Sequence, residues 1–134
     1  MRYQRPELPL KLDGLRAARD FFAGCIAESD VRRETLWVAH VDEEARCLHL
    51  SRHDCNGADG SFPIAKIIAD AAAHHSAGIV LAQRHSSAEP RPGEQHCRVA
   101  KQLAAAAEPL DCTILDHLLF AGPRCTSMRQ LGYL

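Results

Sequence analysis

Three side chains that could contact a metal ion, Gln83, His85 and His96, flank one polar stretch of the sequence. Gln83 and His85 follow the short apolar run 79–82, and their spacing of two places both side chains on the same face of an extended chain. His96 stands near the start of a helical segment, on the face that carries its apolar residues. Because zinc takes imidazole nitrogens and side-chain oxygens as ligands, this spacing indicates a candidate metal cradle.

Periodic patterns predict the elements that must position this cradle. Apolar residues at helical spacing indicate one helix from Asp13 to about Ser29, one that begins near Pro63 and ends before Gly78, and one over 94–107. Apolar or alternating runs indicate strands over 34–42, 47–52, 79–82 and 112–120. This order predicts an α/β fold, an α-β-α sandwich with a mixed central sheet. Residues 83–96 then follow the carboxyl end of a buried strand, where such sheets usually place their chemistry.

Composition limits the kinds of partner. The 134 residues suit one domain, and 16 Lys and Arg against 17 Asp and Glu leave a net charge of −1. Charge alone therefore predicts neither nucleic-acid nor membrane binding. The six cysteines form no C-x-x-C pair, and the first residues lack the apolar region of a secretory signal. We therefore expect reduced thiols and a cytoplasmic protein.

The polar stretch 83–96 resembles, without a gap, the motif H-N-H-P-S-G-D-P-T-P-S-x-x-D of the RadC-type JAB/MPN (JAMM) domain family. Residues 33–42 are similar to the family's R-E-x-F-x-V-L-x-L-D, 114–120 to its L-L-D-H-L-I-I strand, and 127–134 to its closing S-L-R-E-x-G-L-L. The resemblance covers residues 13–134 and leaves 1–12 as an N-terminal arm. It implies the JAB/MPN fold, a cytidine-deaminase-like sandwich.

The resemblance also implies roles for five residues. Active members of the family are zinc peptidases, in which two His and one Asp hold the metal, a Glu takes a proton from the bound water, and a Ser supports the oxyanion. Carried over residue by residue, the metal positions are Gln83, His85 and His96. The base position is Glu34, and the oxyanion position is Gly93. We expect Glu34, Gln83, His85 and His96 to converge in one shallow pocket.

Three of these five positions depart from the family pattern. Gln83 stands for a His, His96 for the Asp and Gly93 for the Ser, and an amide is a poor zinc ligand. Loss of the oxyanion donor alone costs about two to three powers of ten in rate. The departures predict a degenerate, weakly or non-catalytic member with weak or absent zinc, which binds a protein or peptide partner. An extended peptide could pair beside the strand that ends at Ala82.

Two other functions stay open at this point. In the first, His85 and His96 join Glu34 or Glu89 in an altered His₂Glu zinc site, and the protein is an unusual metallopeptidase or isopeptidase. The second, a role in DNA repair, rests on the family name alone. A homo-oligomer is also left open. Each candidate has a plainer explanation as well, with Glu34 as a surface carboxylate and His96 as an interior histidine.

A second set of potential ligands alternates along one face of the extended segment 47–55: Cys47, His49, Ser51, His53 and Cys55. A single strand cannot surround a tetrahedral ion with residues spread over about 25 Å, so we expect edge-strand residues here rather than zinc. Asp116 and His117 also match family positions, and we expect a structural hydrogen bond from them.

Overall fold

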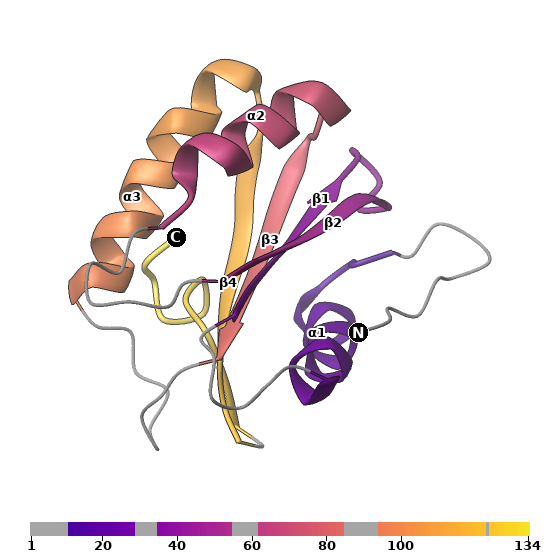
Figure 1. The fold of residues 1–134 in the computed structure, drawn as a ribbon, viewed down its shortest axis with the longest axis vertical. Helices are drawn as coiled ribbons and strands as arrows, with labels where there is room; N and C mark the ends of the chain where they lie inside the picture. The colour runs from indigo at the N-terminus through magenta and orange to yellow at the C-terminus, as the bar shows by residue number, and fades with distance from the viewer. Residues whose placement is uncertain (1–10, 29–34, 55–61, 85–93, 123) are drawn as a thin grey trace.

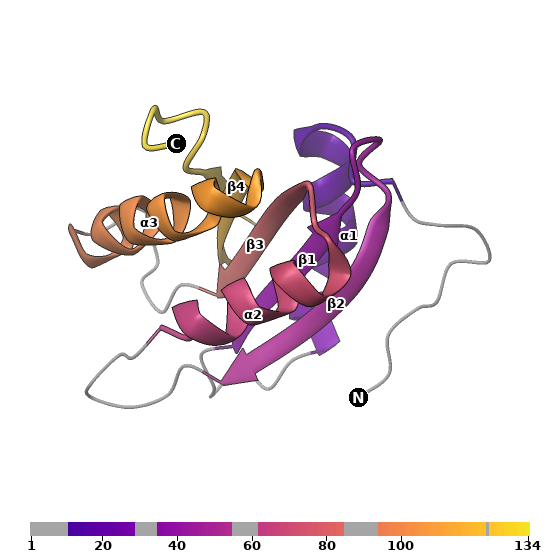
Figure 2. The same cartoon turned by 90° about the horizontal axis from the view of Figure 1, so that it is seen from above.

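The computed structural model describes residues 11–28, 35–54, 62–84, 94–122 and 124–134. Within them one five-stranded mixed sheet has the strand order β2-β1-β3-β4-β5. Helix α1 covers one face of this sheet, and helices α2 and α3 cover the other (Figures 1 and 2). The predicted α-β-α sandwich with a mixed sheet is therefore confirmed.

The sheet is built around a hairpin and one parallel pair. Its strands are β1 (Thr35–Val41), β2 (Cys47–Asp54), β3 (Gly78–Arg84), β4 (Thr113–Ala121) and β5 (Arg124–Ser127). Strand β1 pairs antiparallel with both β2 and β3, β4 runs parallel to β3, and β5 runs antiparallel to β4. Strand β5 is absent from the sequence prediction because four residues are too few to carry a visible alternation.

The three helices are α1 (Leu15–Glu28), α2 (Ile64–His74) and α3 (Glu94–Ala107), and a 3₁₀ turn over Glu108–Leu110 follows α3. They lie within the predicted segments, but α2 ends earlier than the glycine signal suggested. His75 closes α2 in the left-handed conformation at φ 52°, and its backbone N–H faces the carbonyls of the last turn. Gly78 instead opens β3. No helix in the described ranges is long and apolar enough to cross a membrane.

Strand β1 is buried on both of its faces, as the largely apolar residues on both faces of this segment predict. Trp37, Ala39 and Val41 pack in the cluster beneath α1. Leu36 and Val38 pack in the opposite cluster, beneath α2 and α3. Strand β1 thus contributes to two cores, and it positions the end of β3 that lies beside it.

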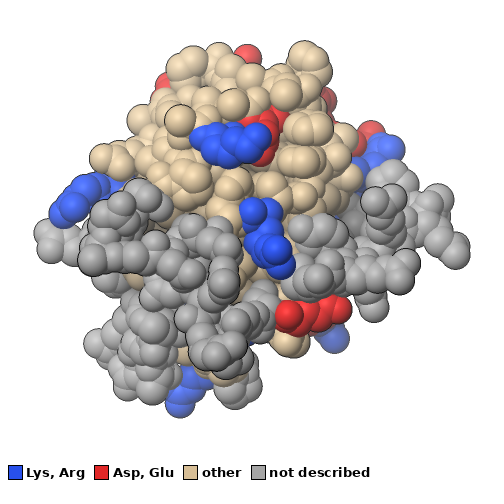
Figure 3. All heavy atoms as spheres, in the orientation of Figure 1, with Lys and Arg blue, Asp and Glu red and all other residues tan. Residues whose placement is uncertain are grey.

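The described part of the face in Figure 3 carries basic and acidic side chains interspersed among uncharged ones. This mixture agrees with the nearly balanced charge of the whole sequence.

The side chains of Leu115 and Val41 leave little room for a Cβ at Gly78. A Cβ there would lie 2.8 Å from Cδ1 of Leu115 and 3.2 Å from Cγ2 of Val41. We expect Gly78→Ala to lower the free energy of unfolding by about 1–3 kcal/mol, measured by urea unfolding. Gly24→Ala is the matched control, because a Cβ on this residue of α1 meets nothing within 4 Å. It should raise stability by about 1 kcal/mol. Equal stability of Gly78→Ala and wild type would contradict the close packing described here.

Candidate functional site

Gln83 lies within strand β3 and not in the loop that the sequence indicated. Its backbone pairs with Leu36 on β1 and with Leu119 on β4, and the residue is 8% exposed. The prediction ended the strand at Ala82 because the apolar run ends there. Pairing with both β1 and β4 carries the strand through Gln83, and pairing with β4 carries it on to Arg84. Gln83 is therefore held in a rigid ladder.

His117 on β4 joins Gln83 to His96. Its Nε2 lies 3.2 Å from Oε1 of Gln83, and its ring meets the ring of His96 edge to face with centroids 6.2 Å apart. His117 is 2% exposed. From the sequence, only a structural hydrogen bond was expected of His117. His117 is therefore a site residue that the sequence did not reveal. The signal available in the sequence was the position of His117 within a largely apolar strand. In the fold this strand lies beside β3, which ends near Gln83.

The buried imidazole of His117 is uncharged at neutral pH. Burial, and secondarily the neighbouring His96, lower the pKa of His117 from 6.5 to about 3. A neutral imidazole carries one N–H and one lone pair. With the amide oxygen of Gln83 as acceptor, the proton of His117 resides on Nε2. The carbonyl oxygen of Gln83, the one good metal-binding atom of an amide, is then already engaged.

Asp116, next along β4, has the structural role that the sequence analysis expected. Its Oδ1 accepts hydrogen bonds from the backbone N–H groups of His117 and Arg129, at 2.7 and 3.1 Å. Its Oδ2 accepts a bond of 2.5 Å from the hydroxyl of Ser127. These bonds tie β4 to the C-terminal segment. Asp116 thus stabilises the fold, whereas its neighbour His117 contacts Gln83 and His96.

The remaining predicted site residues, Glu34, His85, Glu89 and Gly93, lie outside the described residues. The structure brings Gln83 and His96 to the same buried imidazole. Convergence of Glu34 and His85 on this place stays a prediction.

Gln83 is the weak ligand among the described metal positions of this site. An amide is a weak zinc ligand to begin with, and the oxygen of Gln83 is bonded to His117. As the side chains stand, the described ranges contain no group of three or more His, Cys, Asp or Glu arranged to hold a metal ion.

Strand β3 cannot accept an added peptide strand, and this expectation from the sequence is wrong. Residues 78–83 of β3 pair with β1, and the strand also pairs with β4 along its length. Strand addition needs a free row of backbone groups, which an interior strand does not have. The end strands of the sheet are β2 and β5.

Two of the alternating residues of β2, Cys47 and Ser51, make contacts within their own strand. The thiol of Cys47 lies 3.7 Å from the carbonyl oxygen of His49, and Oγ of Ser51 lies 3.0 Å from Nε2 of His53. Cys55 lies outside the described residues. A metal site made from this strand alone has no support in these contacts.

Comparison with known proteins gives the family. The family model for the RadC-like JAB domain matches residues 14–133. The chain belongs to this family. The match confirms the resemblance seen in the polar motif and in the strands on either side of it, and it extends over all elements of the sandwich.

The RadC-like JAB domain has relatives named UPF0758 protein. The one from Methanospirillum hungatei is 36% identical over 69 residues, which are 52% of this chain and 31% of that protein. The one from Aquifex aeolicus is 32% identical over 106 residues, 78% of this chain and 46% of that protein. A third, from Cellvibrio japonicus, is 26% identical over 104 residues, 76% and 46% of the two chains. The chain thus spans less than half the length of these relatives.

Proposed function

We propose that this RadC-like JAB domain is a degenerate member that binds a protein or peptide partner and has weak or no hydrolytic activity. The observation that carries the proposal is the bond between Gln83 Oε1 and Nε2 of His117. The family pattern has a metal-binding imidazole at position 83. Here a buried amide stands in its place and is used to hold a neighbouring side chain.

Hydrolysis of a peptide bond by the family's chemistry needs an activated water, a base and support for the oxyanion. Glu34 matches the base position, but Gln83 is a weak ligand and Gly93 has no hydroxyl. Catalytic groups act as a unit, so the loss of two costs about as much as the loss of all. Zinc at this site is therefore weak or absent in our proposal, and no catalytic step depends on it.

Among the described residues, β2 is the longer of the two end strands of the sheet, and Lys11 forms a single bridge with Arg46 just before it. Strand β2 is eight residues long and stands at the end of the sheet, and it carries Leu48, which is 43% exposed. An extended peptide could add its backbone hydrogen bonds to such an edge and bury an apolar side chain against Leu48. We propose β2 as the place of peptide binding.

The test combines metal content with activity. Elemental analysis of protein never exposed to chelator or a nickel column should find the same zinc content in wild type and in His96→Ala, because no zinc is held at the Gln83 site. Incubation with ubiquitin-like conjugates should give no cleavage, with or without added zinc. Cleavage that disappears in Glu34→Ala would overturn the proposal and favour the metallopeptidase with an altered His/Glu site.

Peptide binding is tested separately, with peptides selected from a displayed library. A bound peptide should slow amide hydrogen exchange in β2, and Leu48→Lys should weaken its binding at least about tenfold. Protection confined to other elements would contradict β2 as the binding edge.

A further inference from the structure

A second group of ligand-type side chains lies under α2, away from Gln83. His40 on β1 pairs with Ile79 at the start of β3, whereas Gln83 lies four residues further along that strand, about 13 Å away. The polar motif over 83–96 does not include these residues. An inference drawn from it therefore does not depend on the proposed function.

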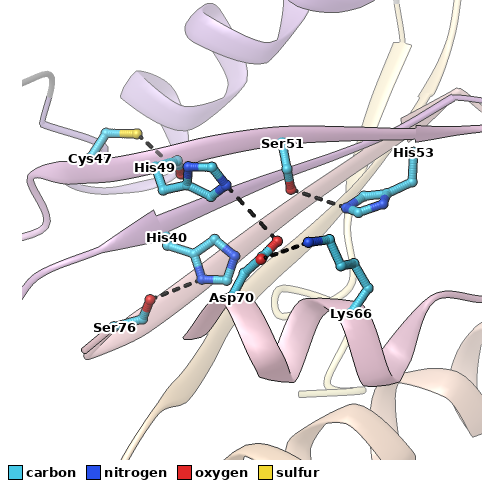
Figure 4. Close-up of polar contacts among 8 residues, drawn as sticks. All are labelled: His40, Cys47, His49, Ser51, His53, Lys66, Asp70 and Ser76. Carbon is cyan, nitrogen blue, oxygen red and sulfur yellow. Dashed lines mark hydrogen bonds and ion pairs between the residues drawn. The ribbon is translucent and has the colours of Figure 1, made fainter. Parts of the chain in front are cut away.

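Two buried polar atoms in this group have no hydrogen-bond partner among the described residues. His40 is 0% exposed, and its Nδ1 lies 2.9 Å from Oγ of Ser76, but its Nε2 has no partner. Asp70 on α2 contacts Lys66 at 3.2 Å through Oδ1, while its buried Oδ2 has no hydrogen bond. Figure 4 shows the unbonded nitrogen of His40 pointing toward the Asp70 carboxylate. Buried polar groups in folded proteins nearly always have a partner, which can be a water or an ion.

Two more imidazoles stand at the same place. His49 is the direct cross-strand partner of His40, and its Nε2 lies 3.9 Å from Oδ2 of Asp70. His74 is four residues after Asp70, hence on the same face of α2, and its ring stacks on that of His49 with centroids 4.2 Å apart. Two ligand-type residues from the sheet thus face two from the helix.

The spacing of these groups is close to that of ligands on one tetrahedral ion. Such ligand atoms lie about 3.4 Å apart, and two ligating imidazole centroids lie about 5.3 Å apart, given zinc–nitrogen distances of about 2.1 Å. The centroid of His40 lies 5.7 Å from that of His49 and 6.3 Å from that of His74. Among the described residues no three groups coordinate as they stand. For all of these side chains to bind one ion, the ring centroids of His49 and His74 must move apart by about 1 Å. His74 is exposed and the side chain of His49 is 33% exposed, so both rings can turn at low cost.

We propose that His40, His49, His74 and Asp70 form a binding site for a borderline divalent metal ion such as Zn²⁺. Three imidazoles and one carboxylate are a donor set that this class of ion prefers. The contact with Ser76 fixes the ring of His40, in the way that outer hydrogen bonds orient ligating histidines. The bound ion holds α2 against β1 and β2.

Zinc titration into the metal-free, untagged chain tests this site, followed by calorimetry and by NMR of the imidazole signals. We expect zinc to shift the signals of His40, His49 and His74 and to raise the melting temperature. His74→Ala should weaken zinc binding at least about tenfold, and Ser76→Ala should weaken it by about 10–100-fold. His75→Asn is the control, because it removes the next imidazole, which is exposed, and Asn tolerates its left-handed backbone.

The variant His96→Ala distinguishes the site under α2 from the candidate site at Gln83. Zinc binding that persists in His96→Ala and is lost in His74→Ala supports the site under α2. Three results would overturn it: no shift of these imidazole signals, equal zinc affinity in His74→Ala and wild type, or binding that disappears only in His96→Ala. Circular dichroism of each variant confirms that it is folded.

Discussion

In a His74→Ala background, which removes the proposed site under α2, the double substitution Gln83→His with His96→Asp should raise the zinc affinity of the Gln83 site at least about 100-fold. It restores the two ligand types that the family pattern places at these positions, an imidazole and a carboxylate. Loss of even an outer partner of a metal ligand changes affinity by about 10–100-fold, so gain of two direct ligands should exceed that. Competition with a chromophoric chelator measures the change.

The fold can accept these changes. Gln83 is held in the ladder of β3 beside His117, and the family pattern combines an imidazole at position 83 with the same Asp-His pair on β4. Gln83→Met in the same His74→Ala background is the matched control, because it keeps the length of the side chain and adds no strong ligand. A double variant that binds zinc no better than Gln83→Met would show that ligand identity is not what limits metal binding here.

Acidification from pH 7 to pH 5 should cost the metal-free protein about 4 kcal/mol of its free energy of unfolding. Two buried histidines cause this loss. Burial lowers the pKa of His40 from 6.5 to about 4 and that of His117 from 6.5 to about 3. A whole domain of this kind is stable by only about 5–15 kcal/mol, so the change is large.

The sign follows from the direction of both shifts. Between about pH 6.5 and the lower folded values, the unfolded chain binds protons that the folded chain excludes, so stability falls as the pH falls. One pKa unit corresponds to about 1.4 kcal/mol, which gives about 2 kcal/mol for each histidine at pH 5. For His40 the like charges of His49, His74 and His53 add to the effect of burial, while Asp70 opposes them.

Urea unfolding at several pH values, with a chelator present, measures this slope. His117→Asn should remove about half of the slope even if it lowers stability at every pH. A stability that stays level from pH 7 to pH 5 would mean that neither imidazole is excluded from protonation by the fold.

Local patterns in the sequence were enough to predict the layers of the fold and much of its outline. The helix over 94–107 has the predicted bounds, and the largely apolar residues on both faces of β1 predicted a strand covered on both faces. These features depend on periodicity within a few turns or residues, which the sequence carries directly. The polar motif at 83–96 with its flanking strands was also enough to predict the family, which the match over residues 14–133 confirms.

Tertiary structure alone decided which side chains meet. The bond of Gln83 to His117 joins residues 34 apart in sequence, through the parallel register of β3 and β4. The interior place of β3 excluded a peptide at its side, and the packing of α2 on the hairpin gathered His40, His49 and Asp70. Hydrophobic periodicity specifies which face of an element is buried, but it does not specify which other element covers that face. Register and strand order arise from the packing of the whole domain, so contacts between distant residues became visible only in the folded chain.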